Sequence, residues 1–295
     1  MKEPLEFHAH TGQVLDLAFT PRGGDLLSGG SDNLIQRWST LSWEKIQTIH
    51  AHEQSVNAIA LSPDGKKLVS GSSDHTTKIW ALPSGELLHT LEGDQKPVTA
   101  VRVSPRGGQF ATASTSGVVR FWSLDKGNEQ KTLKDQTMKS IACLAFSQNA
   151  EVLACGGESE EVLVWKMPGG SLESRLPGHK PPVTSLAFST DDLFLLTADA
   201  DGVLRLWDAK TWQPVWNLPL EAKGIYPLAF DPIQKRFAVG MAYKALLVTT
   251  QEGLVTQELA VEPQGVTSLA FSPDGAWLAM GAADQKIRVW KMEKT

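Results

Sequence analysis

Short apolar stretches alternate with polar residues along the whole chain, and each stretch ends in turn residues. Residues 52–91 show the pattern once, as VNAIALS, KKLVSGSS, TTKIWAL and LLHTL, separated by PDG, Asp74 and PSGE. These stretches are short and rich in Val, Ile, Leu and Thr, which predicts antiparallel strands joined by hairpins. Four strands in about 42 residues leave no length for helices, so the fold class is all-β.

Tryptophan marks the period of this pattern. Five tryptophans stand 42 or 43 residues apart, at Trp38, Trp80, Trp122, Trp165 and Trp207. Trp290 follows after 83 residues, which is two periods, and Val248 and Thr249 stand where the missing tryptophan is expected. A fixed period in this range is typical of repeat architectures. Seven repeats account for nearly all of the 295 residues, so we expect one domain over residues 1–295.

Sheets that are apolar on both faces must be covered on both, and packing seven of them radially in a ring achieves this. The last repeat lacks a fourth strand, because only five residues follow Trp290. At the other end of the chain, Pro4 to His8 form a spare strand-like segment before the first repeat. We therefore predict that the N-terminal strand pairs in the last sheet and closes the ring.

Composition narrows the possible functions. Apolar residues make up 41% and charged residues 21% of the chain, as in soluble globular proteins. The net charge of −5 disfavours nucleic acid as a partner, since phosphate binding needs clustered Lys and Arg. Neither a signal peptide nor a membrane span is evident, so we expect a cytoplasmic protein without membrane insertion. Cys143 and Cys155 are interpreted as buried apolar groups, since two cysteines make no disulfide framework.

A set of His, Ser or Thr, Asp and Trp recurs in three repeats. The sets are His10, Ser28, Asp32 and Trp38; His52, Ser70, Asp74 and Trp80; and His179, Thr197, Asp201 and Trp207, the last with Gly178 and Asp208. In these sets the chain resembles the WD40 repeat family. The resemblance implies a seven-bladed β-propeller of four-stranded blades. It also implies that the Asp binds the His, the His reaches the hydroxyl, and the hydroxyl reaches the indole N–H.

The same residue types also form hydrolase triads. A nucleophilic site is built once, however, whereas this set occurs three times at identical offsets. We therefore expect a structural network, whose groups would each cost about 1–3 kcal/mol if left unpaired. No second His or Cys stands at ligand spacing, so we expect no metal site, no cofactor and no catalytic residue.

Four repeats depart from the set and are expected to depend more on apolar packing. The third has Asp94 and Ser116 in place of His and Asp, and the fourth has Ala154 and Glu158 at the hydroxyl and Asp positions. The sixth has Val239 and Tyr243 and no tryptophan, and the seventh has Met280.

The resemblance places the His and Asp loops on one face, around the mouth of a central channel, where partners of the family usually bind. The loops entering repeats three to six each carry a lysine: Lys96, Lys139, Lys180 and Lys223. Pointing inward, they would form a basic arc for an acidic or phosphorylated segment; otherwise they are merely solvated. Tyr226 and Tyr243 lie in the upper loops of repeat six and could anchor a partner. Alternatively, Tyr243 only fills the space left by the missing network.

On the opposite face, Trp43 and Trp212 stand where most repeats have glycine, and Trp216 follows. Exposed indoles there would indicate an interface. The other interpretation is that each tryptophan folds back over its own outer strand.

The leading hypothesis is a non-catalytic protein-interaction scaffold, monomeric alone or a subunit of a hetero-complex. One alternative is a small-molecule-binding or catalytic propeller with its site in the channel. The inner strands are nearly all apolar, and their exceptions, Asp16, Asn57 and Arg102, do not form an acid, base and oxyanion set. The other alternative is a reader of peptide or histone-like tails, which the acidic rim residues Glu53, Asp94 and Glu262 would permit.

Overall fold

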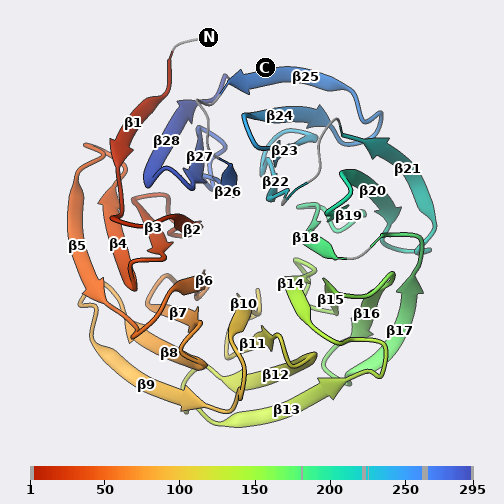
Figure 1. Ribbon diagram of the computed structural model, residues 1–295, viewed down its shortest axis with the longest axis horizontal. Helices are drawn as coiled ribbons and strands as arrows, with labels where there is room; N and C mark the ends of the chain where they lie inside the picture. The colour runs from red at the N-terminus through yellow and green to blue at the C-terminus, as the bar shows by residue number, and fades with distance from the viewer. Residues whose placement is uncertain (1–2, 181, 221–223, 225, 261–264, 294–295) are drawn as a thin grey trace.

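The computed structural model describes residues 3–180, 182–220, 224, 226–260 and 265–293. Within these ranges the chain forms 28 strands and no helix, arranged as seven four-stranded antiparallel sheets. The sheets stand around a central channel as the blades of a propeller (Figure 1). The predicted all-β, seven-bladed fold is confirmed. No helix long and apolar enough to cross a membrane occurs in the described ranges.

The first three blades follow one another along the chain. Blade 1 contains β2 (Val14–Phe19), β3 (Asp25–Gly30), β4 (Leu34–Ser39) and β5 (Lys45–His50). Blade 2 contains β6 (Val56–Leu61), β7 (Lys67–Ser72), β8 (Thr76–Ala81) and β9 (Leu87–Glu92). Blade 3 contains β10 (Val98–Val103), β11 (Gln109–Ser114), β12 (Val118–Ser123) and β13 (Glu129–Lys134).

The other four blades complete the ring. Blade 4 contains β14 (Ile141–Phe146), β15 (Val152–Gly157), β16 (Val162–Lys166) and β17 (Ser171–Leu176). Blade 5 contains β18 (Val183–Phe188), β19 (Phe194–Asp199), β20 (Val203–Asp208) and β21 (Pro214–Pro219). Blade 6 contains β22 (Leu228–Phe230), β23 (Arg236–Gly240), β24 (Lys244–Thr249) and β25 (Val255–Ala260). Blade 7 contains β26 (Val266–Phe271), β27 (Trp277–Ala282), β28 (Lys286–Lys291) and β1 (Leu5–His8).

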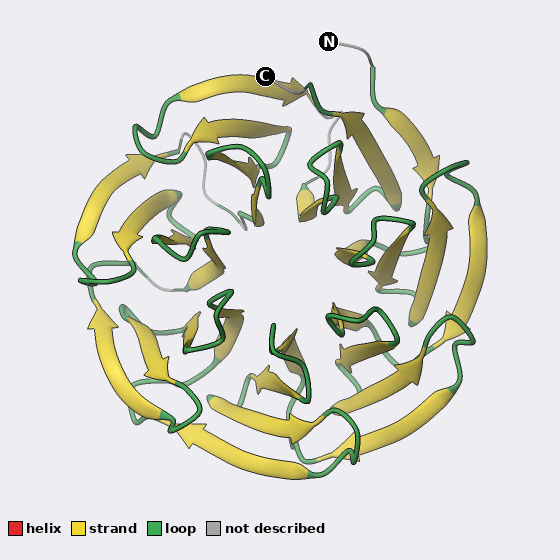
Figure 2. Cartoon of the chain, turned by 180° about the vertical axis from the view of Figure 1, so that it is seen from behind, coloured by secondary structure: helices red, strands yellow, loops and turns green. Residues whose placement is uncertain are grey.

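In blades 1 to 6 the first of four consecutive strands lines the channel and the last lies at the perimeter, and in blade 7 β26 lines the channel and β1 lies at the perimeter (Figure 2). We call the face where the inner strands begin the top face. The bottom face carries the hairpins between the first and second strands of each blade. Equivalent loops of successive repeats therefore lie on the same face of the ring.

The N-terminal strand closes the ring, as the sequence predicts. Strand β1 pairs antiparallel with β28, with Leu5 opposite Val289. Phe7 packs on Trp38 of blade 1, with ring centroids 4.7 Å apart. The first strand of the chain thus completes the last blade and also covers the tryptophan of the first.

The core lies between neighbouring blades rather than within any one of them. Leu27 and Ile35 of blade 1, for example, pack in one cluster with Val56 and Trp80 of blade 2. Gly71 allows such close contact, because a Cβ atom there would lie 2.5 Å from a methyl carbon of Val98 in the next blade.

Inner-strand side chains add polar ties between blades. Register irregularities at the start of β6 and β10 leave Asn57 and Thr99 outside the regular ladders. Asn57 Nδ2 donates to the carbonyl oxygen of Val98 at 2.8 Å. Thr99 Oγ1 donates to that of Ile141 at 2.6 Å. Each bond joins one inner strand to the next blade.

Candidate functional site

Blades 1 and 2 contain the hydrogen-bond network that their spacing suggests. In blade 1, His10 Nδ1 lies 2.8 Å from Asp32 Oδ1 and His10 Nε2 lies 2.8 Å from Ser28 Oγ. The indole Nε1 of Trp38 donates to Ser28 Oγ at 3.0 Å. Each buried polar atom in this chain of contacts has a partner, so the set stabilises the blade.

The network of blade 2 repeats this geometry. His52 lies 2.9 Å from Asp74 and 2.8 Å from Ser70 Oγ. Trp80 Nε1 donates to the same Ser70 oxygen at 2.9 Å. The same His–Asp–Ser–Trp network in two neighbouring blades indicates a repeated structural element and not a single reactive centre.

Blade 5 corrects one residue assignment. His179 Nδ1 bonds Asp199 at 2.8 Å, and not Asp201. His179 Nε2 and Trp207 Nε1 both contact Thr197 Oγ1, at 2.6 and 3.0 Å. Asp199 ends β19 with its side chain buried, and it also accepts the backbone N–H of Val203 at 3.0 Å. Asp201 lies further along the turn, where its carboxylate is 3.7 Å from Lys180 Nζ.

Burial determines the charge state of the three histidines. Desolvation lowers the pKa of His10, His52 and His179, and the adjacent carboxylates offset only part of this effect. In blade 2, burial alone would raise the pKa of Asp74, but hydrogen bonds from Thr76 and the charge of His52 lower it to about 2. In blades 1 and 2, where the pKa of Asp32 and Asp74 is lowered, a neutral imidazole therefore lies beside an ionised carboxylate at neutral pH.

Blade 3 keeps a polar network in altered form, although it is one of the repeats expected to depend more on apolar packing. The buried carboxylate of Asp94 accepts from Ser114 Oγ at 3.0 Å and from Arg120 Nε at 3.1 Å. Trp122 Nε1 still donates to Thr112 Oγ1 at 2.9 Å. Since the charge of Asp94 is buried and paired with Arg120, it is not the acidic rim residue that the sequence suggested.

Blade 4 places a thiol at the hydroxyl position. Strand pairing sets Trp165 opposite Leu153, so Cys155, and not Ala154, corresponds to the serine of blades 1 and 2. The extra residue between Trp122 and Trp165 explains the one-residue error. Trp165 Nε1 is buried without an oxygen or nitrogen partner among the described residues. Cys143 and Cys155 are both free and buried, as expected.

The top face carries three of the four lysines of the sequence-based arc within the described ranges. Lys96, Lys139 and Lys180 are exposed and directly precede the inner strands of blades 3, 4 and 5. Lys180 is 80% exposed and has Asp201 nearby. Lys96 and Lys139 have no carboxylate oxygen within 4.0 Å in the part of the chain that the structure describes. Lys223 lies outside the described residues, as does Glu262.

The two tyrosines of blade 6 have opposite environments. Tyr243 is 67% exposed on the top face. Tyr226 is 1% exposed and packs between blades 5 and 6 with Leu204 and Leu246, so the expectation that it anchors a partner is wrong. Its side chain faces the neighbouring blade, and burial raises its pKa. Only one tyrosine is available to a partner here.

A family model agrees with the repeats found by spacing. The model for the "WD domain, G-beta repeat", WD40, matches residues 1–39, 43–81, 85–123, 127–166, 170–208 and 256–291. These six matches cover well over half of the chain. The chain belongs to the WD40 repeat family. The longest unmatched stretch, residues 209–255, contains most of blade 6, the WD40 repeat without tryptophan.

Curated relatives share part of this WD40 ring. The chain is 30% identical over 161 residues to "Small ribosomal subunit protein RACK1y" of Oryza sativa subsp. japonica, covering 52% of this chain and 48% of that protein. It is 27% identical over 154 residues to "Periodic tryptophan protein 2" of Arabidopsis thaliana, covering 51% and 17%. It is 27% identical over 156 residues to human "Angio-associated migratory cell protein", covering 52% and 36%. The matches thus span less than half of each relative.

The channel of this WD40 ring contains a cavity of about 150 Å³ lined by the inner strands. Asp16 accepts the backbone N–H of Ile59 in the next blade at 2.9 Å, and Asn57 ties blades 2 and 3. Burial raises the pKa of Asp16, and the charge of Arg102 opposes the shift. Arg102 Nη1 donates to the carbonyl of Val101 at 2.8 Å. The three exceptional inner-strand residues serve local and inter-blade bonds and do not assemble an acid, base and oxyanion set.

On the bottom face the extra tryptophans pack between blades. Trp43 contacts Trp277 of blade 7, with ring centroids 5.3 Å apart, and Trp216 stacks on Phe237 of blade 6. Trp43 and Trp212 have φ of 58°, a conformation that glycine adopts at the same turn of other repeats. All three are half-buried. Trp43 and Trp216 reach the neighbouring blade, so the interpretation that each covers its own outer strand is wrong for these two.

No group of three or more His, Cys, Asp or Glu positioned to hold a metal ion occurs in the described part of the chain.

Proposed function

We propose that this chain is a non-catalytic interaction scaffold whose top face binds a segment of a partner protein and helps to assemble a multiprotein complex. One observation carries the proposal. The top-face histidines, hydroxyls and paired aspartates are internally bonded, whereas Lys96, Lys139, Lys180 and Tyr243 are exposed on the same face. The side chains that could act as nucleophile or base are hydrogen-bonded to one another inside the blades. The exposed lysines and tyrosine are of the kinds that bind a partner.

The exposed charges favour an acidic or phosphorylated segment. The ammonium groups of Lys96 and Lys139 lack a carboxylate partner within the described residues, so they attract anionic side chains or phosphate. Tyr243, in blade 6, offers an aromatic contact and a hydroxyl on the same face. A basic, histone-like tail would meet repulsion here, and this argues against that alternative.

Assembly into a complex accords with the relatives. The rice relative is by its name a small ribosomal subunit protein, and hence a component of a larger particle. A cytoplasmic location for the present chain stays a prediction, as does its state as a monomer or hetero-complex subunit.

The test is quantitative affinity purification of the tagged full chain from its native source. The top-face variant combines Lys96→Glu, Lys139→Glu and Lys180→Glu, and a second variant is Tyr243→Ala. The matched control combines Lys66→Glu, Lys126→Glu and Lys166→Glu, three exposed lysines of the bottom face. We expect the top-face variant to lose at least about tenfold of one stoichiometric partner that the control retains.

Thermal unfolding of all variants should match that of the wild type, because the substituted side chains are exposed. Retention of every partner by both top-face variants would contradict the proposal. So would hydrolytic or redox turnover by the purified protein.

A further inference from the structure

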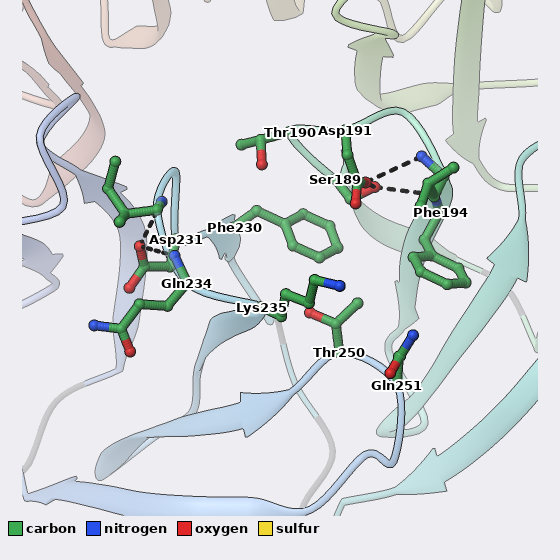
Figure 3. Close-up of a pocket in the computed structure, with 12 residues that line it drawn as sticks. Ser189, Thr190, Asp191, Phe194, Phe230, Asp231, Gln234, Lys235, Thr250 and Gln251 are labelled. Carbon is green, nitrogen blue, oxygen red and sulfur yellow. Dashed lines mark hydrogen bonds between the residues drawn. The ribbon is translucent and has the colours of Figure 1, made fainter. Parts of the chain in front are cut away.

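A cleft on the bottom face separates blades 5 and 6. It has a volume of about 160 Å³ and lies between the first hairpins of the two blades and the last turn of blade 6. Phe194 comes from the blade 5 side and Phe230 from the blade 6 side, with Lys235 and Thr250 between them (Figure 3). An apolar cavity of about 150 Å³ holds a benzene ring. The cleft is therefore large enough for one apolar side chain.

The lips of the cleft are apolar where the other blades are not. Ile233 is the third residue of the blade 6 hairpin turn, counted from Asp231, and is 67% exposed. The corresponding residues of the other six blades are polar or charged: Arg22, Asp64, Arg106, Asn149, Asp191 and Asp274. On the facing hairpin, Leu193 is 56% exposed. The residues at the same position in the other six blades are small or charged: Gly24, Lys66, Gly108, Glu151, Lys235 and Ala276.

In the hairpin of blade 6, a residue other than Ile233 holds the turn. In blade 2, Asp64 holds the turn by accepting from Ser62 Oγ at 2.6 Å and from the Lys66 N–H at 3.0 Å. In blade 6 the buried Asp231 holds the turn, because it accepts hydrogen bonds from the backbone N–H groups of Ile233 and Gln234 at 2.9 and 3.0 Å. Ile233 does not hold the turn, but it lies against Gly275 of the blade 7 hairpin, where an added Cβ atom would be 2.9 Å from Ile233 Cγ1.

A basic side chain, Lys235, lines the cleft. The Lys235 side chain is exposed, with no carboxylate oxygen within 4.0 Å in the ranges the structure covers. The two carboxylates of the cleft are already engaged. Asp231 also accepts Arg236 Nε at 2.8 Å, and Asp191 accepts Ser189 Oγ at 2.6 Å within its own hairpin. The ammonium group of Lys235 thus lies in a cleft of mixed lining, in which Phe194 and Phe230 are the aromatic side chains.

We propose that this cleft binds an extended acidic segment of a partner protein. The segment places one Leu, Ile, Met or Phe side chain against Phe194 and Phe230 and sets a neighbouring carboxylate on Lys235. Apolar surface supplies the affinity, and the ion pair selects the sequence around the anchor. The site goes beyond the proposed function, because it lies on the opposite face of the ring and uses none of the top-face residues.

The probe is a phage-displayed library of random nine-residue peptides, selected on the immobilised full chain. The expected selection is of peptides with an apolar residue within two positions of Asp or Glu. The enriched peptide, labelled with fluorescein, is then titrated by fluorescence polarisation. Its Kd should rise at least about tenfold with Lys235→Glu and with Leu193→Asp. Replacing its acidic residues by Lys should restore binding to Lys235→Glu.

The matched control is Lys66→Glu, at the same hairpin position in blade 2, which should leave the Kd unchanged. The top-face triple variant should also bind normally, so this test can fail or succeed independently of the proposed function. No enrichment, enrichment without acidic residues, or an unchanged Kd in Lys235→Glu would overturn the proposal. Self-association of the wild type that Leu193→Asp abolishes would overturn it too, because a second copy would then occupy the cleft.

Discussion

Asp199 and Asp201 show how a shift of two residues changes the task of a carboxylate. Asp199 is buried and bonds His179 and the Val203 N–H, whereas Asp201 faces the Lys180 ammonium on the exposed rim. Losing a buried acceptor leaves its donors unsatisfied, while an exposed pair contributes little.

We therefore expect Asp199→Ala to lower the free energy of unfolding by about 2 kcal/mol. Asp201→Ala, the matched control, should lower it by less than about 1 kcal/mol. Urea denaturation followed by tryptophan fluorescence measures both. Equal losses would show that Asp199 is not the partner that orients His179.

The buried histidines make stability depend on pH. Because the folded-state pKa of His10, His52 and His179 lies below the ordinary value of 6.5, the unfolded chain binds protons first as pH falls. Their penalty is absent well above that value and grows as pH falls through it. Asp74, with a pKa of about 2, adds a loss that sets in below its ordinary value of 3.8.

The free energy of unfolding should accordingly fall between about pH 7 and pH 5. His52→Gln should reduce the slope in this interval, because one of the three titrations is removed. His50→Gln, at an exposed strand position next to it, should leave the slope unchanged. Urea titrations at pH 7.5, 6.5 and 5.5 measure it, and a flat profile for the wild type would contradict the mechanism.

At the scale of the elements, β1 is the piece that joins the two ends of the ring. Phe7 covers Trp38, and Glu6 pairs with Arg288 at 2.7 Å. Without β1, strand β28 becomes an open edge and the tryptophan of blade 1 loses a neighbour.

Deleting residues 1–8 should destabilise the chain by at least about 3 kcal/mol, the usual cost of removing a packed Phe side chain. At this chain length the melting temperature should fall by roughly 6 °C or more. Deleting only residues 1–3 is the control and should change little, because β1 begins at Leu5. Differential scanning calorimetry measures both melting temperatures. Equal melting temperatures of the two deletion variants would show that β1 does not stabilise the closed ring.

For the molecule as a whole, the ring separates its two loop faces by the full length of the strands. The top-face lysines precede the inner strands, and the cleft between blades 5 and 6 opens where the same strands end. A rigid ring with both sites could hold two partners at once.

If both proposals hold, the two sites should bind independently. The partner lost by the top-face triple variant should remain bound in the presence of saturating cleft peptide, and the Kd of the peptide should change by less than about twofold. Sequential pull-down and polarisation assays measure this. Displacement of the partner by the peptide would show instead that one partner covers both faces.

Much of the fold was predictable because strand pairing repeats along the chain. The tryptophan period identifies seven blades even where blade 6 lacks the residue, and the spare segment before the first repeat predicts β1. The errors occur where the period drifts by one residue, where a different residue type takes over the network, and where a second Asp lies two residues from the expected one, as Asp199 does. Cys155 in place of Ala154 is the first kind, and Asp94 with Arg120 is the second.

By itself, then, the sequence determined the all-β class, the blade count, the closure and two complete networks, because these depend on spacing along one chain. Only the tertiary structure decided that Tyr226 is buried and Tyr243 exposed, that Asp199 holds His179, and that Phe194 and Phe230 share a cleft. Exposure and contact between blades depend on how one blade packs on the next, whereas the choice of Asp199 over Asp201 depends on the geometry of the turn after β19 within blade 5. That packing joins residues about one repeat apart, and no periodic pattern within a single repeat encodes it.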